Sequence, residues 1–192
     1  MLQIVIENFS LLASIKRICD IEMLKKIIFI TLCIILLVGY DFTTKKIAKY
    51  GLEQHTVKSY LGGTIQFVYQ ENTGGMLSLG SQLSETYKII LFRVLVPLVL
   101  TLIFVYTVMK KNLGKLQIAS LILLLGGGLG NWLDRILNNG KVIDFIIVGF
   151  RNFHTGIFNM ADFYVTVGVI LLFLTNVFDK TKSPKQSDTT LE

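Results

Sequence analysis

The sequence predicts a membrane protein with an all-α core, in which four transmembrane helices carry a small extracytoplasmic β-sheet. Of the 192 residues, 52% are hydrophobic and only 17% are charged, against roughly 25% charged residues in an ordinary soluble domain. The mean hydropathy is +0.61. The apolar residues gather in four stretches separated by charged residues, and a helix needs roughly 20 mostly apolar residues to cross a bilayer.

Each of the four apolar stretches is interpreted as one transmembrane helix. The first, 27–40, is the shortest. The second covers 87–109 and contains Pro97, which a membrane helix tolerates when neighbouring helices pack against it. The third covers 116–137 and the fourth covers 159–178. The last three are each about one bilayer thickness long.

The basic residues indicate how these helices are oriented. With the amino terminus in the cytoplasm, ten of the 19 Lys and Arg residues lie on the cytoplasmic side close to helix ends, as the positive-inside rule favours. Both termini are then cytoplasmic, and segments 51–86 and 138–158 are outside. These segments hold Gly-rich and β-branched stretches typical of strands and turns. The net charge of +6 therefore indicates topology, and no nucleic-acid partner is predicted.

The two ends of the chain are treated separately from the central domain, 23–180. Residues 1–22 precede Met23-Leu24-Lys25-Lys26, which is typical of a natural amino terminus, so 1–22 is interpreted as an extension arising from an upstream start codon. The segment 181–192 is polar and contains Pro184. We expect it to be a disordered cytoplasmic tail.

Four aspartates lie at the outer side of the predicted helices: Asp41, Asp134, Asp144 and Asp162. A charged group within a membrane span costs about 2.5–3.5 kcal/mol on insertion scales. Such groups are therefore expected either to be paired or to have a chemical function. Together the four predict an acidic layer at one depth of the membrane.

Two of these aspartates are candidates for a catalytic pair. Asp144 interrupts a run of β-branched and aromatic residues, where loss of solvation raises the pKa of a carboxyl group. Asp162 follows Asn159 by three residues, a spacing close to a capping box, and helix capping alone would explain it. Two acids at one depth favour catalysis more strongly than either does alone.

The third stretch contains GGGLGNWLDR, whose glycines predict close helix packing. Asn131, Asp134 and Arg135 share one helix face in this stretch. An ion pair of Arg135, with Asp134 or with a carboxylate of another span, is the simplest explanation for its presence. Asp41 and Lys45 are also four residues apart, and an i,i+4 ion pair would account for both.

The residue types available limit the chemistry. The two histidines, His55 and His154, lie in separate outer segments without metal-ligand spacing, so neither a metal nor another cofactor is predicted. A Ser-His triad fails for the same shortage, whereas a Ser-Lys pair stays open although the outer serines lack an activating context. Two carboxylates that share a proton can hydrolyse a peptide bond without a metal.

Four motifs in order resemble the lipoprotein signal peptidases (signal peptidase II, aspartyl protease family A8). They are DFTTK at 41–45, NTG at 72–74, GGGLGNWLDR at 126–135 continuing to VIDF at 142–145, and FNMAD at 158–162. The resemblance covers nearly all of residues 23–180. After Asn72 the sequence continues with Gly74-Gly75-Met76-Leu77, where the family usually has Gly-Ala-Ala-Phe.

The resemblance implies an intramembrane aspartyl endopeptidase of the bacterial inner membrane. Such an enzyme removes the signal peptide from diacylglyceryl-modified prolipoproteins, cutting just before the lipidated cysteine, at an active site toward the outer face. The implied catalytic residues are Asp144 and Asp162. The implied substrate-binding and supporting residues are Asp41, Lys45, Asn72, Gly130, Asn131, Arg135, Asn159 and Ala161. The implied partners are prolipoproteins carrying a diacylglyceryl cysteine, membrane lipid and globomycin-like inhibitors.

A small ion- or proton-coupled transporter or channel subunit is the alternative. Membrane-embedded Asp and Arg residues serve equally well as a proton relay. Against it, the two halves of the sequence show no evident repeat, and the acids gather at one depth instead of forming a chain through the bilayer.

Overall fold

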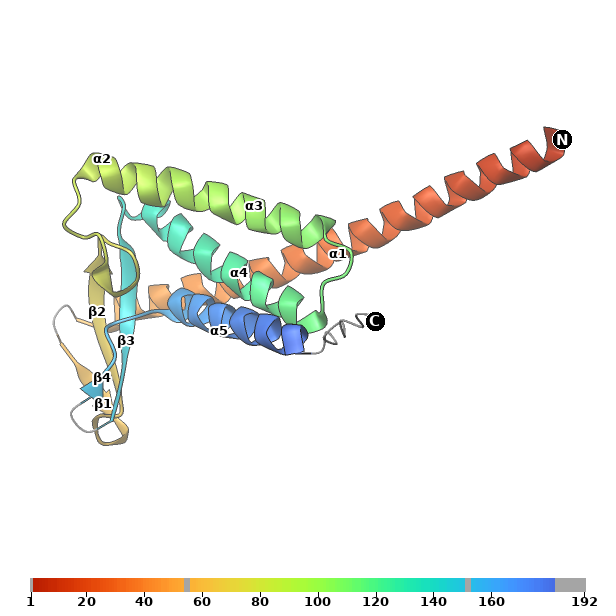
Figure 1. Ribbon diagram of the computed structural model, residues 1–192. Helices are drawn as coiled ribbons and strands as arrows, with labels where there is room; N and C mark the ends of the chain where they lie inside the picture. The colour runs from red at the N-terminus through yellow and green to blue at the C-terminus, as the bar shows by residue number, and fades with distance from the viewer. Residues whose placement is uncertain (1, 54–55, 151–152, 182–192) are drawn as a thin grey trace, which may run out of the picture.

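The computed structural model describes residues 2–53, 56–150 and 153–181 (Figure 1). Within these ranges the chain forms a bundle of long helices with a small antiparallel sheet at one end, which confirms the predicted combination of helical core and sheet. Of the tail expected to be disordered, only Thr181 belongs to the described part, as the last residue of a helix. The remainder lies outside the described residues.

Long helical segments run back and forth between the two ends of the bundle (Figure 1). They are α1 (Leu2–Gly51), α2 (Glu85–Lys88) continuing through a π-helical turn η3 (Ile89–Leu95) into α3 (Val96–Met109), α4 (Lys115–Leu137) and α5 (Met160–Thr181). The segment 1–22, interpreted as an extension, is helical from Leu2 and continuous with the rest of α1. The first helix also continues past Asp41, the expected end of the first span, to Gly51.

Three consecutive glycines allow α4 to pack against three neighbours. A side chain at Gly126 would collide with Leu37 of α1, one at Gly127 with the carbonyl of Ala161 in α5, and one at Gly128 with Leu100 of α3. Because the three glycines lack a β-carbon, the neighbouring helices can approach α4 closely, as the sequence predicts. Accordingly, α4 contacts α1, α3 and α5.

The apolar core lies where α1, α3 and α4 meet. Its buried members are Ile30, Ile34, Leu100, Ile122 and Leu125. Many other large apolar side chains remain exposed along the helices. Soluble proteins seldom expose apolar side chains over such an extended area. This pattern is consistent with a hydrocarbon environment around the bundle.

Two helical segments in the described part of the chain are long and apolar enough to cross a membrane, Glu85–Met109 and Lys115–Leu137. A shorter apolar stretch, Met160–Thr175, lies within α5. The four-span arrangement therefore stays a prediction.

The sheet has the order β1-β2-β3-β4 and is antiparallel throughout. Its strands are β1 (Lys58–Tyr60), β2 (Ile65–Asn72), β3 (Val142–Phe150) and β4 (Phe153–His154). It lies at the end of the bundle opposite the connection between α3 and α4 (Figure 1). The register places Asn72 opposite Val142 and Gln70 opposite Asp144, which brings the end of β2 beside the start of β3 where the helices meet the sheet.

Candidate active site

The site residues predicted from the sequence come from α1, β2, α4, β3 and the start of α5. One continuous network of hydrogen bonds and side-chain contacts connects all of them at the sheet end of the bundle. They are Asp41, Lys45, Asn72, Gly130, Asn131, Arg135, Asp144, Asn159, Ala161 and Asp162.

Asp144 of β3 is only 3% exposed, and both of its carboxyl oxygens accept amide hydrogen bonds. Asn159 Nδ2 donates to Oδ1 at 2.6 Å, and Asn72 Nδ2 donates to Oδ2 at 2.9 Å. Burial, and then the neighbouring charge of Asp162, raise the pKa of Asp144 to about 6, although the two amide bonds oppose the shift. The carboxyl therefore holds its proton over a wider pH range than an exposed aspartate.

Asp162, in the first turn of α5, is 7% exposed and accepts a hydrogen bond on Oδ1 from Asn131 Nδ2 at 2.8 Å. It also forms the capping box that the sequence indicated. Its backbone N–H donates to Asn159 Oδ1 at 2.9 Å, and the backbone N–H of Asn159 donates to Asp162 Oδ2 at 3.3 Å. Capping fixes this carboxyl in place next to the Asn159 amide.

Asn159 is the residue that connects the two aspartates. Its side-chain amide donates to Asp144 while its side-chain oxygen accepts from the backbone of Asp162. Its Nδ2 also donates to Asn131 Oδ1 at 3.2 Å. Because Asn159 is completely buried, these bonds hold the two carboxyl groups in one desolvated site.

Lys45 of α1 is the second centre of the network and is 1% exposed. Its ammonium group lies 2.7 Å from Asp41 Oδ2, 3.0 Å from Asp134 Oδ2 and 3.0 Å from Asn131 Oδ1. The three ammonium hydrogens thus face three acceptors. The predicted i,i+4 pair with Asp41 is confirmed, and it belongs to a larger cluster that reaches α4.

Asp41 joins α1 to the start of α5. Its Oδ1 accepts the backbone N–H of Ala161 at 2.9 Å, one of the donors left free at a helix start. A β-carbon at Gly130 would lie 2.7 Å from Asp41 Oδ2. Gly130 therefore leaves the room that the Asp41 carboxylate occupies.

Arg135 behaves differently from the prediction. Within the described ranges, no carboxylate lies within ion-pair distance of its guanidinium, and Asp134 is paired with Lys45 instead. Arg135 Nη1 donates to the carbonyl of Asn131 at 2.8 Å, and Nη2 donates to the carbonyl of Gly74 at 2.6 Å. Asp134 and Arg135 were expected on one helix face with Asn131, but adjacent helical residues do not face each other, and the two reach different partners.

An apolar groove of about 940 Å³ runs along α1, α4 and α5. Phe29, Cys33 and Ile122 line it, as do Met160 and Tyr164 in the first turns of α5. The sequence analysis did not single out this groove. Hydropathy locates apolar helices but not the gap between them.

The sequence analysis also passed over Arg93, in the π-helical turn η3. Arg93 is a charged residue within the second apolar stretch, and placing its charge in a membrane span costs free energy, as it does for the four aspartates. This cost is the signal that would have identified Arg93.

A family model and sequence relatives both indicate the same protein family. The model of the family described as "Signal peptidase (SPase) II" matches residues 33–178. The lipoprotein signal peptidase of Borrelia duttonii (strain Ly) is 35% identical over 131 residues, which cover 65% of this chain and 75% of the relative. That of Francisella tularensis subsp. novicida (strain U112) is 34% identical over 151 residues, covering 78% and 91%.

A solved bacterial membrane enzyme has the same fold as this chain. It superposes with a TM-score of 0.72 at 24% identity, over 82% of this chain and 93% of that one.

Proposed function

The chain belongs to the signal peptidase II family, the lipoprotein signal peptidases, and we propose that Asp144 and Asp162 are its catalytic pair. Family membership makes it a bacterial membrane protease acting on lipoprotein signal peptides. The finer proposal is an aspartyl mechanism that cuts the peptide bond just before the lipidated cysteine. Its main support is Asn159, whose side-chain amide donates to the Asp144 carboxyl and whose backbone N–H donates to the Asp162 carboxyl.

In the proposed mechanism the pair shares one proton. Asp144 carries it, because burial and the charge of Asp162 raise its pKa to about 6. Asp162 is the ionised member, since its carboxylate accepts hydrogen bonds from Asn131 and the Asn159 backbone and lies at a helix start, where the dipole favours negative charge.

Asp162 then takes a proton from a water molecule, and the oxygen of that water attacks the scissile carbonyl carbon. Asp144 donates a hydrogen bond to the carbonyl oxygen and stabilises the negative charge that develops there. Breakdown of the tetrahedral intermediate passes the proton from Asp162 to the leaving amine of the cysteine. Both carboxyls thereby return to their starting protonation states.

The apolar groove supports a lipid-modified substrate. Its lining includes Met160 and Tyr164, each two residues from Asp162 along α5, and the rest follows the helices. We propose that an acyl chain of the diacylglyceryl cysteine occupies this groove while the peptide bond reaches the aspartates. Globomycin-like cyclic peptides, in this proposal, compete with the substrate for the same site.

The orientation proposed from the sequence agrees with this placement. Both termini are cytoplasmic in the proposal, with the sheet and the aspartates at the outer face. The connection between α3 and α4, at the opposite end of the bundle (Figure 1), contains Lys110 and Lys111 and no acidic residue, as expected for a cytoplasmic loop.

The test is to incubate the purified full chain with a diacylglyceryl-modified prolipoprotein and to follow the loss of the signal peptide by mass. Asp144→Asn and Asp162→Asn should each lower the rate at least about a hundredfold, because each removes a proton-transfer group. Glu53→Gln, which changes an exposed carboxylate outside the network, should leave the rate unchanged.

Three results would contradict the proposal. A folded Asp144→Asn or Asp162→Asn variant that processes substrate at the parent rate rules out the pair. A product that does not begin with the lipidated cysteine rules out the cut site. Equal rates on lipidated and unlipidated precursors rule out the role of the groove in recognising lipid.

A further inference from the structure

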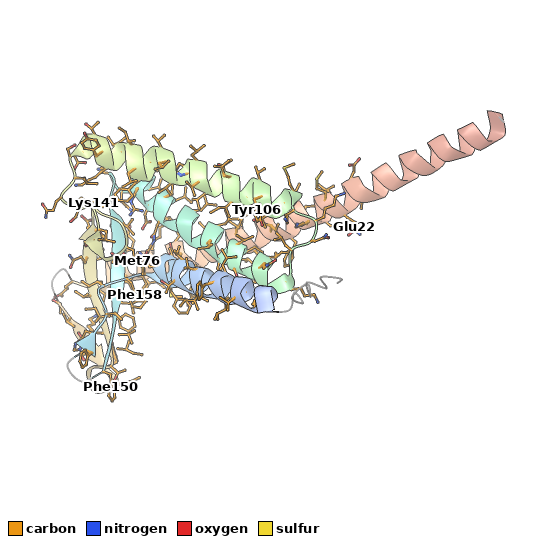
Figure 2. All side chains as sticks on the ribbon, in the orientation of Figure 1. Glu22, Met76, Tyr106, Lys141, Phe150 and Phe158 are labelled. Atoms are coloured by element: carbon orange, nitrogen blue, oxygen red, sulfur yellow. The ribbon has the colours of Figure 1, made fainter. Side chains whose placement is uncertain are left out.

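A second, polar cavity of about 300 Å³ lies at the sheet end of the bundle, where the helical segment that begins with α2 meets the end of α4. Four basic residues line it: Lys88, Arg93, Arg135 and Lys141. One acidic residue, Glu85, is also part of the wall. Figure 2 labels Lys141, at the end of the molecule where the sheet lies. The mechanism proposed above makes no use of this cavity.

Two of the four cations are already neutralised by carboxylates. Lys88 Nζ lies 3.1 Å from Glu85 Oε1, and Lys141 Nζ lies 2.7 Å from Glu71 Oε2. That second contact is strong enough to lower the pKa of Glu71, chiefly through the hydrogen bond from Lys141. The two arginines of the cavity, in contrast, form no ion pair in the described part of the chain, and the Arg135 guanidinium lies over the Phe92 ring at 4.7 Å.

Arg135 has one donor without an acceptor, and the Arg93 guanidinium has no acceptor among the described residues. Arg135 is 7% exposed, and its Nε has no hydrogen-bond partner among the described residues. A buried donor without an acceptor destabilises the folded protein, and a charged donor does so more strongly than a neutral one. The guanidinium of Arg93 forms no ion pair or hydrogen bond in the described part of the chain. Arg93 therefore brings an unpartnered guanidinium to the cavity, and Arg135, which also lines it, brings one buried donor without a partner.

Arg93 is held in position by its backbone. Trp132 Nε1 donates a hydrogen bond of 3.3 Å to the Arg93 carbonyl, which ties η3 to α4. Gly140 lies against the side chain, since a β-carbon there would be 3.2 Å from Arg93 Nη2. Single π-helical turns such as η3 occur frequently at functional sites. The cavity is thus largely formed before any ligand binds.

We propose that this cavity binds the phosphate group of a membrane phospholipid, with Arg93 and the Nε of Arg135 as its donors. The planar guanidinium fork matches the geometry of phosphate oxygens. Basic pockets between membrane helices bind lipid head groups. The cavity lies at the start of the span Glu85–Met109, which is the depth of the lipid head groups. A charge near the membrane needs a partner, and the phosphate and the arginines would pair there.

Phosphate binding in this cavity needs no atom of Asp144 or Asp162, but it shares Arg135 with the network around them. A bound phosphate would therefore act close to the two aspartates. Arg135 also donates to the carbonyls of Gly74 and Asn131, so a phosphate on Nε would hold both segments around the aspartates.

The test uses the full chain in a maltoside detergent, which contains no phosphate, and measures the melting temperature during titration. The probes are a short-chain phosphatidylglycerol, a glycosyl diacylglycerol with the same acyl chains, and inorganic phosphate. We expect a saturable rise in melting temperature with phosphatidylglycerol, no saturable rise with the glycolipid, and a weaker response to inorganic phosphate.

Variants separate this cavity from nonspecific attraction. Arg93→Gln should weaken phosphatidylglycerol binding about tenfold or more, and Arg93→Lys should lie between Arg93→Gln and the parent chain. Lys111→Gln, an exposed cation in the connection between α3 and α4, should bind as the parent does. Unchanged binding by Arg93→Gln, or an equal response to the glycolipid, would overturn the site. A full response to inorganic phosphate at the same concentration would overturn the lipid as its source.

Discussion

The ammonium group of Lys45 on α1 lies 3.0 Å from Asp134 Oδ2 on α4, and both side chains are almost completely buried. The pair ties two helices that are distant in the chain. It also supplies Asp134 with a cation, so that Arg135, the next residue, is available to donate to the carbonyl of Gly74. Lys45 thereby supports the Asp144–Asp162 site without contacting either aspartate directly, through its hydrogen bond to Asn131.

Replacing Lys45 by methionine should strongly destabilise the protein. Lys45→Met leaves Asp41 and Asp134 buried without their cation, and breaking a buried pair from one side costs about 3–5 kcal/mol. Thermal unfolding in detergent should show a large drop in melting temperature together with loss of peptidase activity. Asp134→Asn should cost clearly less, because Lys45 keeps Asp41 and Asn131 as partners. Equal melting temperatures for Lys45→Met and the parent would disprove the cluster.

Gly130→Ala should damage the site, whereas Gly39→Ala should not. A β-carbon at Gly130 would lie 2.7 Å from Asp41 Oδ2, while one at Gly39 would meet nothing within 4 Å. Displacing the Asp41 carboxylate weakens its bonds to Lys45 and to Ala161, at a cost of about 1–3 kcal/mol. Melting temperature and processing rate should both fall for Gly130→Ala alone. A parallel fall in Gly39→Ala would show that any helical glycine has this effect.

Stability should depend on pH through Asp144. Burial raises its pKa from 3.8 to about 6, so between these values the folded chain binds this proton more tightly than the unfolded chain does. The resulting stabilisation is complete below about pH 4 and is lost as the pH rises through about 6. Relative to Asp144→Asn, which has no such proton, the unfolding free energy of the parent should decline by about 3 kcal/mol across this window.

The corresponding measurement is a set of thermal unfolding curves of both proteins between pH 4 and pH 7. Titrating groups outside the coupled Asp144–Asp162 pair affect the parent and the variant alike, so the difference between the two reports the proton held by this pair. A difference that stays constant across this range would show that the Asp144 carboxyl has an ordinary pKa.

A chain beginning at Met23 should keep its activity. The amino-terminal part of α1 extends beyond the bundle (Figure 1), and Glu22 lies far from the sheet end (Figure 2). Lys26 Nζ donates to the carbonyl of Lys110 at 2.8 Å, and this contact with the bundle is retained. The processing rate should change by less than about twofold, as for other exposed regions. Loss of activity would show that residues 1–22 are functional.

The sequence by itself predicted the membrane environment of the helices and the contacts between residues that are close in the chain. Apolar runs of bilayer length predict the helices, and short-range spacings predict the pair of Asp41 with Lys45 and the capping box of Asn159 with Asp162. These contacts depend only on helix geometry, in which residues three or four apart are neighbours.

The tertiary structure alone decided the contacts between distant segments. Asn72 meets Asp144 because β2 pairs with β3 in one register, and Lys45 meets Asp134 because the α4 glycines let the helices approach. The expected ion pair of Arg135 was wrong for this reason: its partners are the carbonyls of Asn131 and of Gly74, and Gly74 comes near only through the folding of the segment after β2. Charge and hydropathy identify residues that need partners, but only packing brings a particular partner within hydrogen-bond distance.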